Sequence, residues 1–340
     1  MKKIIAVLTI LFLLQNNVSR TNADIPDLPL TEYIIVDGEK ISLKNGLDLS
    51  GKNLRGIEIH YLDRTLKNIN FSGCDLEGAD FSETSFDNCS FREAKLINLP
   101  SLLAKGSNDL TNAEIGNIEF LGITRKQLES TASFKRKSLW RIRFSTCDFR
   151  SVDFSGFDLQ QIDFKYTLLT NSDFTDAVIG EGCSLGTSFP HYAMTYEQLK
   201  SSHGYRVGMT YEQLQSTRSY KDGNFINVFL NLTWPEGRAD FSGMNLTGCY
   251  FGPGGTYNHV EIDNLSQFYS SSKKPEKRGW SDRCQLDLTD SVITKCNFRD
   301  FKGLTLENVK STWNYKNNQM EGIILPKEIQ EALDAEKEQQ

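Results

Sequence analysis

Apolar residues recur at every fifth position along two long stretches of the chain. The first stretch runs from Leu66 to Leu96, and the second from Leu139 to Ile179. A helix repeats every 3.6 residues and a strand every two, so neither accommodates a strict period of five. A chain that turns a corner every five residues does accommodate it. Four corners close a square coil of about twenty residues, and successive coils would stack at the parallel-strand spacing of roughly 4.8 Å.

Each repeat of five has a large apolar residue at its centre, and central residues twenty apart should form inward columns. Phe154 would then lie against Phe174, and Phe144 against Phe164. The residue two before each centre is small or apolar and would fill the rest of the interior. The phenylalanines expected in this core are Phe71, Phe81, Phe91, Phe144, Phe149, Phe154, Phe164 and Phe174.

The segment Ala79-Asp80-Phe81-Ser82-Glu83 fits the pattern A-[DN]-[LF]-x-x of the pentapeptide-repeat family. The chain resembles secreted members of that family. This resemblance implies an all-β solenoid, a right-handed quadrilateral parallel β-helix. In this chain the β-helix would carry short α-helical insertions and a C-terminal helix.

A second, slower motif recurs between the five-residue runs. It begins at Thr124, Thr195, Thr210 and Thr305, and reads Thr-x-x-Gln-Leu in three copies. Thr-x-x-Gln is a capping box, which satisfies free amides at a helix start, so each copy predicts a short helix. Helices this short are unstable alone and must dock on the solenoid. They are interpreted as structural insertions, or alternatively as a recognition surface formed by Tyr196, Tyr211 and Lys221.

These patterns divide the chain into segments with different structures. They are a signal peptide (1–23), a β-hairpin cap (24–46), pentapeptide-repeat β-helix (47–122), a short helical insertion (123–137), β-helix (138–185), tandem helical insertions (190–222), β-helix (223–252), a surface-loop insertion (253–283), degenerate repeats with a fourth helical motif (284–325), and a C-terminal helix or tail (326–340).

The first 23 residues have the pattern of a secretory signal. Lys2 and Lys3 precede an apolar run from Ile4 to Leu14, and Thr21-Asn22-Ala23 offers a cleavage site before Asp24. Eleven residues of helix span only about 16 Å, too short for a bilayer. We therefore expect a secreted protein, periplasmic or extracellular, without a membrane span after cleavage.

Seven cysteines in a secreted chain would ordinarily predict disulfides. Five of them lie two residues before a repeat centre and are expected to be reduced core residues: Cys74, Cys89, Cys147, Cys249 and Cys296. Cys183 and Cys284 appear outside the repeat register, and a disulfide between them is an open alternative. No cysteine or histidine has the spacing of a metal site.

Aspartate is frequent just before the repeat centres, and Asp153 and Asp173 should lie side by side in neighbouring coils. A calcium site is one interpretation of such stacked carboxylates. The favoured interpretation is that each aspartate accepts a hydrogen bond from its own turn, as aspartate does in turns generally. No cofactor is otherwise expected, and no catalytic residue is assigned.

The sequence predicts a non-enzymatic structural or protein-interaction scaffold, with an unidentified protein or envelope component as partner. The formal net charge of −6 makes the chain a poor ligand for nucleic acid. Two alternatives stay open. The resemblance allows an acidic mimic of nucleic acid that acts on an enzyme such as DNA gyrase, although a signal peptide would keep it from that target. Parallel β-helices also include carbohydrate-active enzymes that use paired carboxylates.

Overall fold

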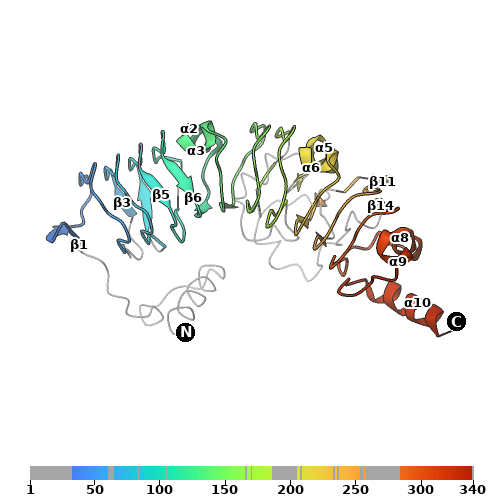
Figure 1. Cartoon of the computed structure of the whole chain (residues 1–340). Coiled ribbons are helices and arrows are strands. Elements are labelled where there is room, and N and C mark those ends of the chain that lie inside the picture. Colours follow the sequence, from blue (N-terminus) through green and yellow to red (C-terminus); the bar gives the residue numbers. More distant parts are fainter. Residues whose placement is uncertain are drawn as a thin grey trace, which may run out of the picture.

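The structure is a computed structural model of the whole chain (Figure 1). It describes residues 33–59, 65–82, 84–103, 106–164, 167–169, 171–185, 205–206, 209–232, 234–235, 237–252, 256–257 and 284–338. The candidate signal segment, the motif copy at Thr195 with Tyr196, most of the loop 253–283 and all four histidines lie outside these residues.

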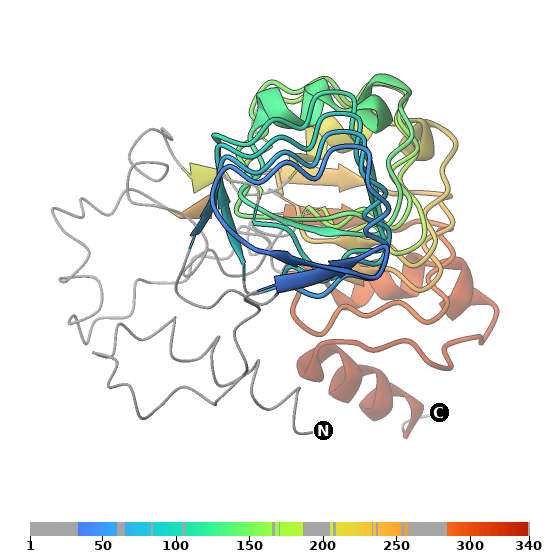
Figure 2. The same ribbon diagram turned by 90° about the vertical axis from the view of Figure 1, so that its left-hand side faces the viewer.

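The described chain winds into coils that stack in parallel. Backbone bridges join Asn70 to Ser90, Arg143 to Asp163, and Asp153 to Asp173, each pair twenty residues apart. Figure 2 looks along the stack and shows the coils superposed as a four-sided outline. The five-residue period thus produces a β-helical solenoid, because each turn of the chain meets its equivalent one coil later.

The strands are short, since each side of a coil is only a few residues long. The parallel pairs are β3 (Thr65–Lys67) with β4 (Ser85–Asp87), β5 (Lys95–Ile97) with β6 (Glu114–Gly116), β7 (Glu119–Leu121) with β8 (Arg143–Ser145), β10 (Phe229–Leu230) with β12 (Tyr250–Phe251), and β11 (Gly237–Asp240) with β14 (Cys284–Asp287). β9 (Tyr205–Arg206) pairs with β13 (Thr256–Tyr257) in antiparallel fashion.

The interior consists of columns of stacked side chains. All eight phenylalanines expected in the core are at most 1 % exposed. The rings of Phe154 and Phe174 are stacked with centroids 5.3 Å apart, and those of Phe144 and Phe164 are 5.8 Å apart. Stacked and edge-on aromatic pairs of this kind add to the energy of burial alone.

All seven cysteines are unpaired and buried in the solenoid. The prediction that Cys183 and Cys284 lie outside the repeat register is wrong. Cys183 lies two residues before the buried Leu185, and Cys284 two before Leu286, so both occupy the inner position. Their repeats adjoin stretches without the five-residue period, which hides the register in the sequence. The Cys183–Cys284 disulfide is therefore not formed.

The buried thiols should be unreactive in the native protein. Burial raises the pKa of Cys147, Cys249 and Cys284 to about 12, so almost no thiolate exists at neutral pH. We expect an aromatic disulfide reagent to titrate none of the seven thiols at pH 7 and all seven in guanidinium chloride. Fast reaction of one or two thiols in the native state would contradict the inward placement of those residues.

The residue before each repeat centre caps the turn that follows. The backbone amide of Ser155 donates to Asp153 Oδ1 at 2.8 Å, and that of Thr175 donates to Asp173 Oδ1 at 2.8 Å. Asn70 does the same for Ser72. These contacts show that Asp153 and Asp173 cap their own turns, as the favoured interpretation of the aspartates predicts. Among the described residues, no group of three His, Cys, Asp or Glu side chains could hold a metal ion.

Pairs of short helices occupy part of some coils. They are α2 (Arg125–Ser130) with α3 (Ala132–Lys135), α5 (Tyr211–Ser216) with α6 (Arg218–Lys221), and α8 (Leu306–Ser311) with α9 (Trp313–Lys316). Each first helix begins with a complete capping box, headed by Thr124, Thr210 and Thr305. The capping residue Gln127 also donates from Nε2 to the carbonyl of Asn108 in the preceding coil, at 2.8 Å.

The helix pairs lie within the stack of coils because polar side chains replace the missing strand. The hydroxyl of Ser133 accepts from the amide of Ile115 at 2.9 Å and donates to its carbonyl at 3.1 Å. Ser219 makes the same two bonds with Ile179. In the third pair, Asn314 Oδ1 accepts from the amide of Ile293. These side chains keep the backbone of the preceding coil satisfied where a helix cannot pair with it.

Both ends of the described stack carry a capping element. At the first end, β1 (Tyr33–Val36) and β2 (Glu39–Ser42) form an antiparallel hairpin through a turn at Asp37 and Gly38, both with positive φ. Ile34 and Val36 point inward and are buried. At the other end, α10 (Lys327–Lys337) follows Pro326 and buries Leu333. Within the described part of the chain, no helix is long and apolar enough to span a membrane.

Candidate functional site

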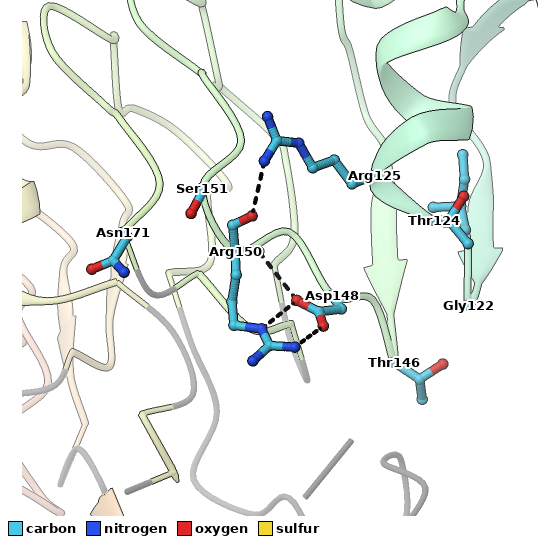
Figure 3. A pocket seen from close by; sticks show the side chains of 9 residues that line it. Gly122, Thr124, Arg125, Thr146, Asp148, Arg150, Ser151 and Asn171 are labelled. Carbon is cyan, nitrogen blue, oxygen red and sulfur yellow. Dashed lines mark hydrogen bonds and ion pairs between the residues drawn. The ribbon is translucent and has the colours of Figure 1, made fainter. Parts of the chain in front are cut away.

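A surface recess lies beside α2, where a helical coil is followed by extended coils. Its volume is about 590 Å³, and its lining comes from residues 122–125, 146, 148, 150, 151 and 171 in three successive coils. Figure 3 shows that Arg125 reaches from α2 toward the loop that carries Arg150, with Asp148 between α2 and this loop.

The charges of the recess are held in defined positions. Arg150 Nε and Nη2 donate to Asp148 Oδ1 at 2.8 Å and Oδ2 at 2.5 Å. Arg125 Nε donates to Glu129 Oε1 at 2.8 Å, and Arg125 Nη1 approaches the carbonyl of Arg150 at 3.5 Å. Burial of Asp148 opposes its ionisation, but the hydrogen bonds from Arg150 outweigh it and hold the pKa of Asp148 below its ordinary value.

Tyr211 and Lys221, which were expected to share a recognition surface, have different roles in the structure. Tyr211 is only 5 % exposed and packs against the rings of Tyr220 and Phe241. Its hydroxyl accepts from the backbone amide of Asp240 at 2.7 Å, so this tyrosine has a structural role. Lys221 is exposed and forms an ion pair with Asp176 at 2.8 Å. The prediction that Tyr211 belongs to an exposed recognition surface is wrong, because this side chain is buried. Tyr196 lies outside the described residues.

A second feature of the surface is an outward column of larger side chains on one lateral side. Phe229 pairs with Tyr250 in the next coil, Tyr250 with Asn297, and Asn297 with Ile324. We call these four residues the lateral column. Phe229 is 51 % exposed and Ile324 39 % exposed, and the rings of Phe229 and Tyr250 are 5.9 Å apart. The sequence alone does not reveal this column, because its members are separated by 21 to 47 residues and belong to irregular repeats.

The first coils carry a network of charges on one outer side. Arg55 Nη1 contacts Asp75 at 3.1 Å and Glu77 at 2.6 Å, and Lys95 contacts the same Glu77 carboxylate. Hydrogen bonds from Arg55 and Lys95 lower the pKa of Glu77 to about 2. The carboxylates of this region are thus largely neutralised by neighbouring bases.

This network predicts an acid-sensitive contribution to stability. A carboxylate with a lowered pKa stabilises the fold fully above its unfolded pKa, here the ordinary value of 4.5, and loses that effect as the pH falls toward 2. Glu77→Gln should therefore lower the melting temperature at pH 7, and the difference from the native chain should disappear by about pH 2. A difference that stays constant from pH 7 to pH 2 would contradict this ionisation.

Comparison with known proteins supports the repeat. Residues 66–98 and 147–179 match the family model for pentapeptide repeats, with eight copies. No curated protein shows a significant match to the chain.

Solved structures of pentapeptide-repeat proteins also show some similarity. One is HetL, involved in heterocyst differentiation regulation in the cyanobacterium Nostoc, at 13 % identity over 83 % of this chain and 91 % of HetL, with a TM-score of 0.20. Another is trypsin-treated QnrB1, a plasmid-mediated fluoroquinolone resistance protein, at 17 % identity over 84 % of this chain and 94 % of QnrB1, with a TM-score of 0.21. Similarity at these TM-scores carries no argument for function. The family match and the parallel ladders together show that this chain contains pentapeptide repeats stacked as a β-helical solenoid.

Proposed function

We propose that this protein is an exported, non-enzymatic scaffold, a right-handed four-sided β-helix that binds a protein partner through the lateral column. The observation that carries the proposal is the exposure of Phe229 beside Tyr250 on the outer side of two adjacent coils. Tyr250 is half-buried, and its hydroxyl donates to Asp300 at 2.7 Å, so Phe229 is the aromatic side chain that the column exposes. An exposed aromatic side chain beside a second ring is typical of surfaces that bind another macromolecule.

The position of these residues in the repeat strengthens the proposal. Most residues before a repeat centre are polar and accept the amide of the following turn, as Asp153 and Asn245 do. Phe229, Tyr250 and Ile324 hold the same position without such an acceptor group. Folding alone gains nothing from leaving a large apolar side chain in water at this position. A partner that covers the column would account for it.

Binding through the column can be tested with a charged substitution. The native chain, Phe229→Asp and Trp313→Asp would be used as bait with proteins of the envelope and the culture medium, and captured proteins quantified by mass spectrometry. Trp313 is 39 % exposed in α9 and serves as the matched control. A protein retained by the native chain and by Trp313→Asp, but lost with Phe229→Asp, is the expected result. Equal capture of every protein by all three baits would contradict the proposal.

Export is tested by fractionation and intact mass. Recovery outside the cytoplasm, at the mass of a chain that begins at Asp24, is expected when the full chain is expressed in a Gram-negative host. An unprocessed chain in the cytoplasm would contradict the proposed localisation. It would also favour the alternative of an acidic mimic that acts on DNA gyrase, which the net charge of −6 allows. Inhibition of gyrase supercoiling by the purified protein would then be the decisive assay.

A further inference from the structure

The recess beside α2 contains polar side chains that the fold does not use. The hydroxyls of Thr146 and Ser151 and the carboxamide of Asn171 line it, and none of them forms a hydrogen bond within the described part of the protein. Equivalent corner residues elsewhere do bond to each other. The carboxamide of Asn88 donates to Asn68 at 2.7 Å, and that of Asn117 donates to Asn98 at 2.8 Å. The corners at the recess lack this ladder and leave their groups directed to a ligand or to water.

The guanidinium groups of the recess also keep unused donors. Arg150 uses Nε and Nη2 for Asp148, which leaves Nη1. Arg125 uses Nε for Glu129 and Nη1 for a long contact of 3.5 Å, which leaves Nη2. Each terminal nitrogen carries two N–H groups, and a guanidinium recognises a carboxylate through paired donors. Each arginine is paired with one carboxylate, Arg150 with Asp148 and Arg125 with Glu129, so the recess offers an acidic group unused N–H donors and no excess charge.

This set of groups defines the chemistry of a ligand. Hydroxyls, a carboxamide and a carboxylate together recognise a molecule with many hydroxyl groups. The hydroxyls and the carboxamide can donate hydrogen bonds to it and accept them from it, and the carboxylate can accept them. The unused N–H donors of Arg125 Nη2 and Arg150 Nη1 recognise one acidic group. A volume of about 590 Å³ lies in the range of small-molecule sites. We propose that the recess beside α2 binds an acidic sugar residue, such as a hexuronate, at the end of or within a glycan.

The site is separate from the lateral column, so the two proposals stand or fall independently. The recess is built by residues 122–171, and the column by residues 229–324. The sugar is held and not cleaved, because the arrangement presents one carboxylate that is already paired with Arg150. A free sugar acid and a sugar acid within a polysaccharide offer the recess the same hydroxyl and carboxylate groups. Comparing the affinities of a monomer and of longer oligomers distinguishes these two ligands.

The test is calorimetric titration of the full chain with trigalacturonate, with maltotriose as the neutral comparison. We expect trigalacturonate to bind with a Kd of about 1 mM or lower, and maltotriose at least about tenfold more weakly. Arg125→Gln should weaken trigalacturonate binding about tenfold. Asn171→Ala should weaken it several-fold without changing any charge. Monomeric galacturonate that binds as tightly as the trimer would assign the site to one sugar residue.

The matched control is Arg136→Gln, which removes an exposed arginine just after α3 that pairs with Glu114 outside the recess. Binding should be unchanged in this variant. Equal weakening by Arg125→Gln and Arg136→Gln would overturn the proposal, because it would show attraction by net charge alone. Absence of binding to the native chain at millimolar trigalacturonate would overturn it as well. Unchanged melting temperatures of the variants show that each is folded.

Discussion

Phe154→Ala is expected to lower the free energy of unfolding by about 3–5 kcal/mol, the range for truncation of a buried phenylalanine. Phe154 is fully buried and stacks on Phe174, and four further aromatic rings surround it at centroid distances of 5.4 to 6.1 Å. The neighbouring coils are fixed by their own ladders and cannot collapse into the space left behind. Urea unfolding followed by circular dichroism measures the effect.

The neighbouring residue provides the control. Asp153→Asn keeps a side-chain oxygen for the amide of Ser155, the role that Asn53 and Asn70 have in their own turns. The change should therefore cost far less than 1 kcal/mol, as surface substitutions generally do. Small and equal losses in Phe154→Ala and Asp153→Asn would show that Phe154 does not point inward.

Tyr211→Phe is expected to lower the free energy of unfolding by about 1 kcal/mol, the net contribution of a typical hydrogen bond, because the amide of Asp240 that loses its partner is only partly buried. The residue before a repeat centre normally bonds through its backbone to the coil before it. In the coil before Asp240, the segment that would pair with its backbone is the helix α6, and a helix cannot pair with it as a strand would. The hydroxyl of Tyr211 accepts from the amide of Asp240 at 2.7 Å, and that of Tyr220 donates to its carbonyl at 2.5 Å.

The helix pair α8 and α9, nearer the C-terminus, supplies the control for this prediction. Tyr315 of α9 corresponds to Tyr220, but its hydroxyl forms no hydrogen bond within the described residues. Tyr315→Phe should leave the urea midpoint unchanged, whereas Tyr211→Phe should lower it. Equal midpoints for the two variants would mean that the tyrosine hydroxyls do not replace the missing strand.

The sequence was sufficient to predict which residues form the interior, because the inward direction of each side chain is set within its own repeat. A corner every five residues forces Phe144, Phe154 and their equivalents inward, and the aspartate before each centre lies within reach of its own turn. Both features repeat without reference to distant parts of the chain. The capping boxes at Thr124, Thr210 and Thr305 are local in the same sense.

Other features depend on which residues meet across coils, and single-repeat patterns do not show this. Tyr211 reads as an exposed aromatic residue of a polar helix, yet the coil that follows buries it. Cys183 and Cys284 lie beside irregular stretches, so counting in fives loses their register. For Tyr211 the outcome depends on Asp240, which lies 29 positions away in the sequence.

The recess illustrates the same limit for a binding site. Thr146, Ser151 and Asn171 are ordinary corner residues in the sequence, and nothing distinguishes them from the corners that form ladders. They meet beside Arg125 only because successive coils stack next to the start of α2. The spacing between Arg125 and Arg150 corresponds to no motif, since a coil that contains helices is longer than twenty residues.

The most direct test of the stacked coils is a cross-link between equivalent outward positions. Asp153 and Asp173 are bridged in adjacent coils, and parallel strands are spaced at roughly 4.8 Å, within the range that a disulfide spans. The double variant Asp153→Cys with Asp173→Cys should form a disulfide rapidly under mild oxidation, while the seven buried native thiols stay unreactive. Asp153→Cys with Asp163→Cys places the new thiols on different sides of one coil and should not cross-link. Cross-linking in the second pair and not in the first would contradict the twenty-residue coil on which the whole account depends.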